Sequence, residues 1–216
     1  PGGLCALVPG RGPRDVRRPR PAFGVLAMGG GVDVGLESAA ACREFMAHDH
    51  PGPVRRERSV YGWPDGYREQ IKGATLIASP GCYPTSILLP VLPLLRAKLI
   101  KPTGIIADSL SGVSGAGRKA EVNYLFVECN ESVRPYGLPK HRHCSEIEQE
   151  LSLAAGQPVI VQFTPHLIPV NRGILTTLYL APENHFQSAE EMAALQGKIA
   201  TYYRRRAGAA PCRVVL

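Results

Sequence analysis

Cys82 lies in the stretch of the chain best suited to covalent chemistry. Before it, an apolar run over residues 74–78 ends at Ser79-Pro80-Gly81, a combination that stops a strand. After it, Pro84 is compatible with a first helical turn, and a second apolar run covers residues 87–95. The pattern predicts a strand, a tight turn and a helix, with the thiol at the helix N-terminus. Unpaired amides there favour a nucleophilic thiolate, whereas a small cysteine buried in a core would need no such turn.

Two histidines, His141 and His143, are the candidate partners of this thiol. They come just before a predicted helix, and in an extended segment they would point to opposite sides. A loop histidine is suited to general acid/base catalysis beside a nucleophile. The alternative is a zinc site that adds Cys129 and Cys144, but the spacing of these four residues is irregular. We therefore expect acid/base chemistry and no metal.

A loop rich in glycine and serine follows a predicted buried strand at residues 104–108. It runs from Ser111 to Lys119 and contains Arg118 near its end. Small residues with hydroxyls and free amides allow close approach of an anionic group, although a flexible linker would have a similar composition. A second polar loop, residues 164–173, contains His166 and Arg172. We expect both loops to contribute to a site.

The remaining elements are predicted from periodicity and capping residues. Residues 159–163 and 174–180 have the β-branched content and alternation of strands, and their connection suggests a largely antiparallel sheet. Residues 126–131 are interpreted as a further short strand. Ser145 is expected to cap a helix that starts at residue 146, and Ser188 to cap an amphipathic helix over residues 188–203.

Composition limits the classes of protein that the chain can belong to. With 44% hydrophobic and 20% charged residues, it resembles ordinary globular proteins, and no run approaches the ~18 apolar residues of a membrane helix. We expect no secretory signal, and six cysteines without paired spacing indicate reduced thiols in a cytoplasmic compartment. The net charge of +7 is concentrated in terminal segments such as residues 1–20, with five arginines and one aspartate. No aromatic residues interleave these runs, so we expect no nucleic-acid partner.

Five separated blocks together resemble one enzyme family, the N-acetyl-γ-glutamyl-phosphate reductases of arginine biosynthesis. The blocks are YGWPDGYREQIKGA at 61–74, ASPGCYPT at 78–85, SGVSGAGRK at 111–119, HRHCSEIEQ at 141–149 and FTPHLIPVNRGIL at 163–175. The resemblance covers roughly residues 41–200. It implies an α/β protein in which a Rossmann domain precedes an α+β catalytic domain like that of glyceraldehyde-3-phosphate dehydrogenase. It also implies a homo-oligomer that reduces a small acyl phosphate with NADPH.

The resemblance also assigns roles to individual residues. Cys82 would displace phosphate to form a thioester, which hydride from NADPH would reduce, and the hemithioacetal would collapse to N-acetylglutamate 5-semialdehyde. His143 would be the acid/base, with His141 as the competing candidate. The NADP(H)-binding loop would include Ser111, Gly112, Ser114, Gly115 and Ala116, and the substrate's anionic groups would meet Arg118 and Arg172.

The family pattern implies boundaries at residues 40 and 80. Residues 1–40, rich in Pro, Gly and Arg, match nothing in the family and are expected to be disordered. Residues 41–80 would be a remnant of the NADP-binding domain whose Rossmann core is largely missing, and residues 81–216 a C-terminally incomplete catalytic and dimerisation domain. We hypothesise a fragment or frame-disrupted copy. Departures within the matched blocks are Ser86 and the pair Cys144-Ser145.

Two other functions remain open. A sister reductase of lysine biosynthesis would act on an aminoadipyl phosphate, and one methylene changes binding by only ~1–3 kcal/mol. The third reading is an inactive remnant that persists only as an oligomerisation partner.

Overall fold

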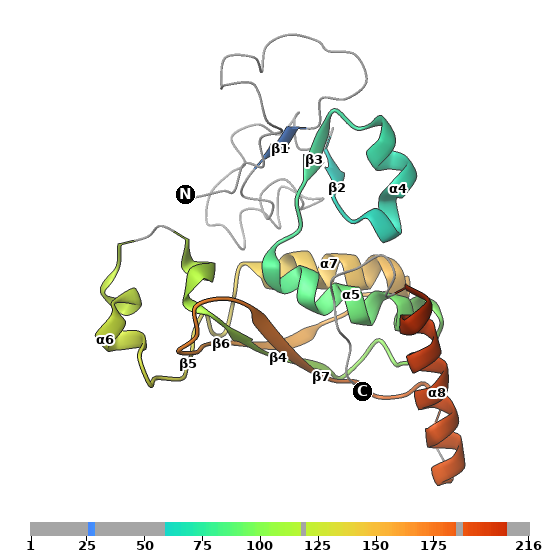
Figure 1. Cartoon of the computed structure of the whole chain (residues 1–216). Helices are drawn as coiled ribbons and strands as arrows, with labels where there is room; N and C mark the ends of the chain where they lie inside the picture. The colour runs from blue at the N-terminus through green and yellow to red at the C-terminus, as the bar shows by residue number, and fades with distance from the viewer. Residues whose placement is uncertain (1–25, 29–58, 118–119, 185–187, 207–216) are drawn as a thin grey trace.

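The structure is a computed structural model that describes residues 26–28, 59–117, 120–184 and 188–206. The described residues form two sheets (Figure 1). The smaller sheet has the order β1-β3-β2 and is parallel throughout; its strands are β1 (Leu26–Met28), β2 (Val60–Tyr61) and β3 (Leu76–Ala78). Helix α4 (Pro64–Gly73) connects β2 to β3. Parallel strands joined by a helix are typical of α/β domains.

The larger sheet is mixed, and its strand order is β5-β6-β4-β7. Its strands are β4 (Ile105–Ser111), β5 (Arg134–Pro135), β6 (Val161–Leu167) and β7 (Ile174–Tyr179). β4 pairs parallel to β6 and antiparallel to β7. β5 also pairs antiparallel to β6, so the expected largely antiparallel sheet is confirmed, although β4 lies between β6 and β7. The strands predicted at residues 104–108, 159–163 and 174–180 are confirmed as β4, β6 and β7, with boundaries shifted by a few residues.

Two helices, α5 (Cys82–Arg96) and α7 (His143–Ala155), lie side by side over one face of this sheet (Figure 1). The nearly continuous apolar sequence of α5 explains its position, since nine of its residues are buried. Pro90 and Pro93 lie inside α5 although an internal proline removes a backbone hydrogen bond. Burial of the neighbouring leucines and of Val91 outweighs this cost. The result is an α+β unit with one core between helices and sheet, as the fold class predicts.

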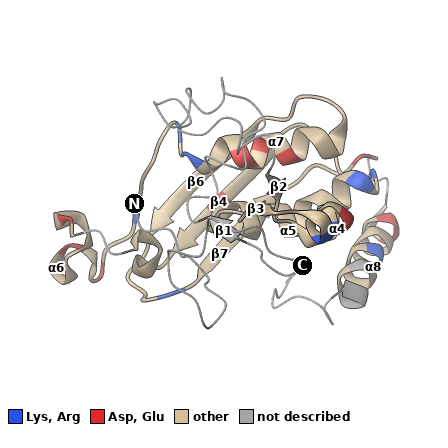
Figure 2. Ribbon diagram, turned by 90° about the horizontal axis from the view of Figure 1, so that it is seen from above, with Lys and Arg blue, Asp and Glu red and all other residues tan. Residues whose placement is uncertain are grey.

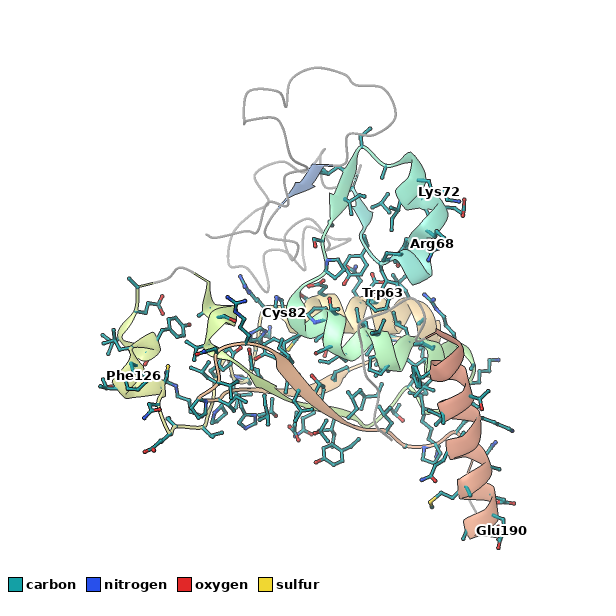
Figure 3. The ribbon with its side chains drawn as sticks, in the orientation of Figure 1. Trp63, Arg68, Lys72, Cys82, Phe126 and Glu190 are labelled. Atoms are coloured by element: carbon teal, nitrogen blue, oxygen red, sulfur yellow. The ribbon has the colours of Figure 1, made fainter. Side chains whose placement is uncertain are left out.

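The other elements lie at the periphery of this unit. They are the 3₁₀ helices η2 (Val113–Ala116) and η3 (Val122–Tyr124), and the α-helices α6 (Phe126–Cys129) and α8 (Ala189–Arg206). The strand expected at residues 126–131 is wrong. This segment projects from the sheet (Figure 3) and satisfies its amides locally, with Asn130 N–H donating to Phe126 O. The Ser188 cap is confirmed, because its Oγ accepts the Glu191 amide at 3.2 Å.

Part of the segment expected to be disordered has regular structure. Residues 26–28 form β1, which pairs with β3 in register Leu26 with Leu76. Disorder is therefore the wrong prediction for these three residues. The rest of residues 1–40 and residues 41–58 lie outside the described residues. Where this chain is described, no helix is both long and apolar enough to cross a membrane.

Candidate active site

Cys82 is the first residue of α5, and Gly81 precedes the helix in an extended conformation. The predicted strand, tight turn and helix are thus confirmed. The Cys82 thiol is free and exposed, which contradicts the reading of a core cysteine. Figure 3 shows it where the chain passes from the smaller sheet to α5. This position gives the thiol both a rigid helix behind it and access to a small molecule.

The environment of Cys82 does not favour the thiolate as strongly as expected. The amide groups of Tyr83 and Cys82 donate toward the sulfur, and Arg142 adds a positive charge nearby. These three groups lower the pKa of Cys82. Desolvation by the surrounding protein is the largest effect, and together with Glu146 it raises the pKa of Cys82 above its usual value. The expected stabilisation of the thiolate by the amides at the helix N-terminus is therefore present but is outweighed by desolvation. The thiol needs a base.

His143 lies directly against the turn that precedes Cys82. It is the first residue of α7, and its side chain is buried. A Cβ atom added to Gly81 would be 2.6 Å from His143 Nε2, so the imidazole edge occupies the space beside the glycine. Burial lowers the pKa of His143 to about 3. The imidazole is consequently neutral at pH 7 and can accept a proton at the nitrogen that faces the turn.

His141 has a different task. Its Nδ1 accepts the backbone N–H of His143 at 3.1 Å, so this side chain caps the start of α7. Arg142, between the two histidines, has a helical conformation, so the segment is not extended as the prediction of opposite sides required. The two rings pack edge-on with centroids 4.9 Å apart. Helix α7 also begins earlier than expected, and Ser145 is not its cap: its Oγ donates to Arg142 O within the first turn.

Glu146 is a site residue that the sequence did not single out. Its side chain is fully buried, and Oε1 accepts two hydrogen bonds, from Tyr61 Oη at 2.6 Å and from the Gly81 amide at 2.9 Å. Desolvation raises the pKa of Glu146 to about 7. Other glutamates occur on α7 (Figure 2), so residue type alone does not distinguish Glu146. The sequence signal that could have identified Glu146 was its position three residues after the candidate base His143.

Tyr83 connects Cys82 to the glycine- and serine-rich loop. Its ring contacts both His141 and His143, and its hydroxyl is 2.6 Å from that of Tyr136. A hydrogen bond between the side chains of Tyr83 and Ser111 lowers the pKa of Tyr83, although burial raises it overall. The structure therefore brings Ser111, at the end of β4, to the same cluster as the two histidines.

The loop after Ser111 fits a cofactor only in part. Its amides are not free, because those of Gly112, Val113 and Ser114 donate to the carbonyls of Gly173, Val170 and Asn171. Ser114 and Gly115 are exposed, so the loop offers a surface of small residues. It suits a flat group lying against it and does not form an amide cradle for phosphate.

Of the two arginines expected to bind substrate, the structure describes one, Arg172. Arg172 is exposed, and its backbone packs against Gly112, where an added Cβ would be 2.8 Å from Arg172 N. The two polar loops therefore lie side by side. Arg118 lies outside the described residues. Among the described residues, no group of three or more His, Cys, Asp or Glu side chains is placed to hold a metal ion.

Comparisons with known proteins agree with this architecture. Residues 82–206 match the model of the semialdehyde dehydrogenase dimerisation domain. The N-acetyl-gamma-glutamyl-phosphate reductase of Akkermansia muciniphila is 56% identical over 147 residues, which are 68% of this chain and 42% of that protein. The reductase of the same name from Moorella thermoacetica is 53% identical, over 69% of this chain and 43% of its own length. The chain thus spans less than half the length of these curated relatives.

A solved structure also aligns with the chain. It is aspartate semialdehyde dehydrogenase II of Vibrio cholerae, with a TM-score of 0.49 and 16% identity, over 66% of this chain and 49% of that one.

Proposed function

The chain belongs to the semialdehyde dehydrogenase family, and on this premise we propose that it acts in the reductive dephosphorylation of N-acetyl-γ-glutamyl phosphate. The product would be N-acetylglutamate 5-semialdehyde, formed through a thioester on Cys82. One observation carries the proposal: a neutral imidazole, His143, lies against the residue that precedes an exposed free thiol. The names of the relatives support the choice of substrate.

The first half-reaction needs only residues of this chain. His143 accepts the proton of the Cys82 thiol, and the thiolate attacks the acyl carbon of the substrate. A carbon–sulfur bond forms, the carbon–oxygen bond to the phosphoryl group breaks, and inorganic phosphate leaves. The raised pKa of Cys82 explains why a base is required, and the lowered pKa of His143 keeps that base unprotonated at neutral pH.

The second half-reaction requires a reductant. When bound, NADPH supplies the hydride that reduces the acyl group. The exposed residues Ser114 and Gly115 and the half-buried Ala116 would lie beside its flat ring, next to the buried Ser111 and Gly112. The residues of this chain hold the acyl group on Cys82, and the proton that His143 accepted returns to the Cys82 sulfur as the aldehyde leaves.

Arg172 and Arg118 are the proposed contacts for the anionic groups of the substrate. Arg172 has an exposed side chain at the edge of the loop that packs against Gly112. A guanidinium can hold a carboxylate or a phosphate by two parallel hydrogen bonds. These roles leave Cys82 and His143 to the chemistry.

Acylation of Cys82 tests this function without a cofactor. The 216-residue chain would be mixed with N-acetyl-γ-glutamyl phosphate and, separately, with the aminoadipyl analogue, and the adduct located by peptide mass mapping. We expect acylation at Cys82 with the first substrate, release of phosphate, and no adduct in Cys82→Ser. Faster acylation by the aminoadipyl compound would reassign the substrate. A folded chain that is acylated by neither would be the inactive remnant.

The family description suggests that the chain assembles with copies of itself. The face of the larger sheet opposite α5 and α7 carries the exposed side chains Leu175 and Tyr179 on β7, and such apolar surface is typical of contact regions. We propose a homo-oligomer in the cytoplasm, where the free thiols of Cys82, Cys129 and Cys144 would stay reduced. Light scattering of the purified chain measures its mass directly.

A further inference from the structure

A single buried carboxylate oxygen joins three separate parts of the chain. Glu146 Oε1 accepts one hydrogen bond from Tyr61 on β2 and another from the amide of Gly81, while Glu146 itself lies on α7. The second oxygen, Oε2, is buried without a hydrogen-bond partner among the described residues. Burying a carboxyl group is costly unless its contacts compensate. The position of Glu146 therefore depends on its two donors.

The same helix contacts Gly81 twice. Glu146 holds the Gly81 amide, and His143, one helical turn earlier, places Nε2 where a Gly81 side chain would begin. Gly81 is followed directly by the nucleophile. Any change in the Glu146 hydrogen bond therefore moves Cys82 relative to the imidazole of His143.

Tyr61 is firmly held on the other side of this contact. β2 pairs with β3, and the Gly62 amide donates to Ala78 O at 2.7 Å. The buried Tyr61 ring thus has a fixed backbone, and its hydroxyl reaches a residue 85 positions away in the sequence. Other groups that act on Glu146 are Glu150, on α7, and Arg142, the residue before α7. Glu150 accepts the Tyr67 hydroxyl and not the Gly81 amide.

We propose that Tyr61 and Glu146 are positioning residues that hold the Gly81 turn so that the Cys82 thiol faces His143. The smaller sheet would then contribute to the reaction through one hydroxyl group, although Tyr61 touches neither substrate nor nucleophile. This inference rests on the proposed role of His143 as the base for Cys82. In this proposal Glu146 acts as a hydrogen-bond acceptor for Tyr61 and Gly81. Its acceptor oxygen therefore matters more than its negative charge.

Alkylation of Cys82 by iodoacetamide tests the proposal without substrate or cofactor. The rate would be measured at pH 7 by peptide mass mapping in the 216-residue chain, with and without His143→Gln, in four backgrounds: native, Tyr61→Phe, Glu146→Ala and Glu146→Gln. Tyr67→Phe is the matched control, because Tyr67 donates to Glu150 one turn farther along α7 and not to Glu146. Circular dichroism would confirm that each variant is folded.

The measured quantity is the factor by which His143→Gln slows alkylation. We expect about tenfold in the native background, and about threefold or less in Tyr61→Phe and Glu146→Ala, since loss of one hydrogen bond loosens the pair. Glu146→Gln keeps an acceptor oxygen and should retain most of the native factor, as should Tyr67→Phe.

Two results would overturn the inference, and they are distinguishable. If the factor in Tyr61→Phe and Glu146→Ala equals the native one, even with a lower melting temperature, these residues are structural only and the proposed function stands. If His143→Gln has no effect in the native chain, the base role fails, and with it both the mechanism and the positioning role.

Discussion

At the scale of single residues, the reactivity of Cys82 depends on a balance between desolvation and its few polar contacts. The amides at the start of α5 and the guanidinium of Arg142 favour the thiolate, but they are outweighed by the surrounding protein. The sequence predicted the helix N-terminus correctly, but its effect on the pKa of Cys82 was overestimated. Desolvation depends on residues brought in from α7, which the local sequence does not show. In the proposed mechanism, the neutral imidazole of His143 compensates for this environment by accepting the thiol proton.

Replacing Gly81 by alanine tests how close this base lies. The φ angle of Gly81 is −64°, so alanine fits the backbone, but its Cβ would be 2.6 Å from His143 Nε2. The buried ring cannot move freely, because it packs against Tyr83 and His141. We expect Gly81→Ala to slow acylation of Cys82 by about tenfold or more, on the order of what misplacing a catalytic group costs. Gly73→Ala, on a helix end with open space, is the control; equal rates in both variants would contradict this geometry.

The two histidines should separate in a pH profile. Because burial lowers the pKa of His143 to about 3, the imidazole stays neutral as the pH falls through 6.5, where an ordinary histidine becomes protonated. The His143-dependent part of the acylation rate, taken as the native rate minus that of His143→Gln, should therefore persist down to about pH 5.

His141→Ala should behave differently. It removes the cap of α7 and is expected to lower the free energy of unfolding by about 1 kcal/mol, a typical value for a lost cap, with the shape of the pH profile kept. If the His143-dependent acylation rate decreases below pH 6.5, or is lost in His141→Ala, the base would be His141 and not His143.

At the scale of elements, the sequence predicted those helices and strands in which apolar residues recur with the period of one type of secondary structure. The strand before Cys82, helix α5 and strands β4, β6 and β7 are of this kind. The predictions failed for segments whose secondary structure the local sequence pattern does not determine. Residues 126–129 have strand-like composition but form a short helix whose backbone hydrogen bonds are local. Helix α7 begins at His143 because a histidine side chain takes the place of the expected serine cap.

Packing between α5 and α7 is what holds Cys82 near His143, and one side chain reports on it. Ile147, one residue after Glu146, is completely buried in the shared core. Ile147→Ala should lower the free energy of unfolding by about 2–5 kcal/mol. Leu153→Ala on the same helix, where the side chain is 51% exposed, should cost far less. Urea denaturation measures both, and similar values for the two would show that the contact between the helices contributes little.

At the scale of the whole molecule, the smaller sheet, α5 and α7 meet at the turn between Ala78 and Cys82. The order of the blocks along the sequence predicted the nucleophile and the histidines together. It did not predict the Glu146 contact, because Tyr61 and Glu146 come together only when β2 and α7 are placed in space. Their hydrogen bond joins residues that no local pattern relates.

The buried titratable groups give the whole molecule a distinctive pH dependence of stability. Glu146 has a pKa of about 7 in the folded chain, raised from 4.5, so between these values the folded state holds a proton that the unfolded state has lost. The free energy of unfolding must then fall as pH rises from about 4.5 to 7, by up to about 1.4 kcal/mol per pH unit from this group. His141 and His143 act in the opposite direction. Their lowered pKa values mean that stability is lost as pH falls below 6.5 toward 4 and 3.

The two contributions are separated by comparing variants. Urea denaturation of the native chain and of Glu146→Gln at pH 5, 6, 7 and 8 gives the difference in free energy of unfolding at each pH. Because the histidines are common to both proteins, their effect cancels in this difference. We expect the native chain to lose stability relative to Glu146→Gln from pH 5 to pH 7, and the difference to level off above pH 7, where Glu146 is ionised in both states. A difference that stays constant from pH 5 to pH 8 would mean that Glu146 carries its charge in the folded chain throughout. The hydrogen bonds from Tyr61 and Gly81 would then outweigh its desolvation.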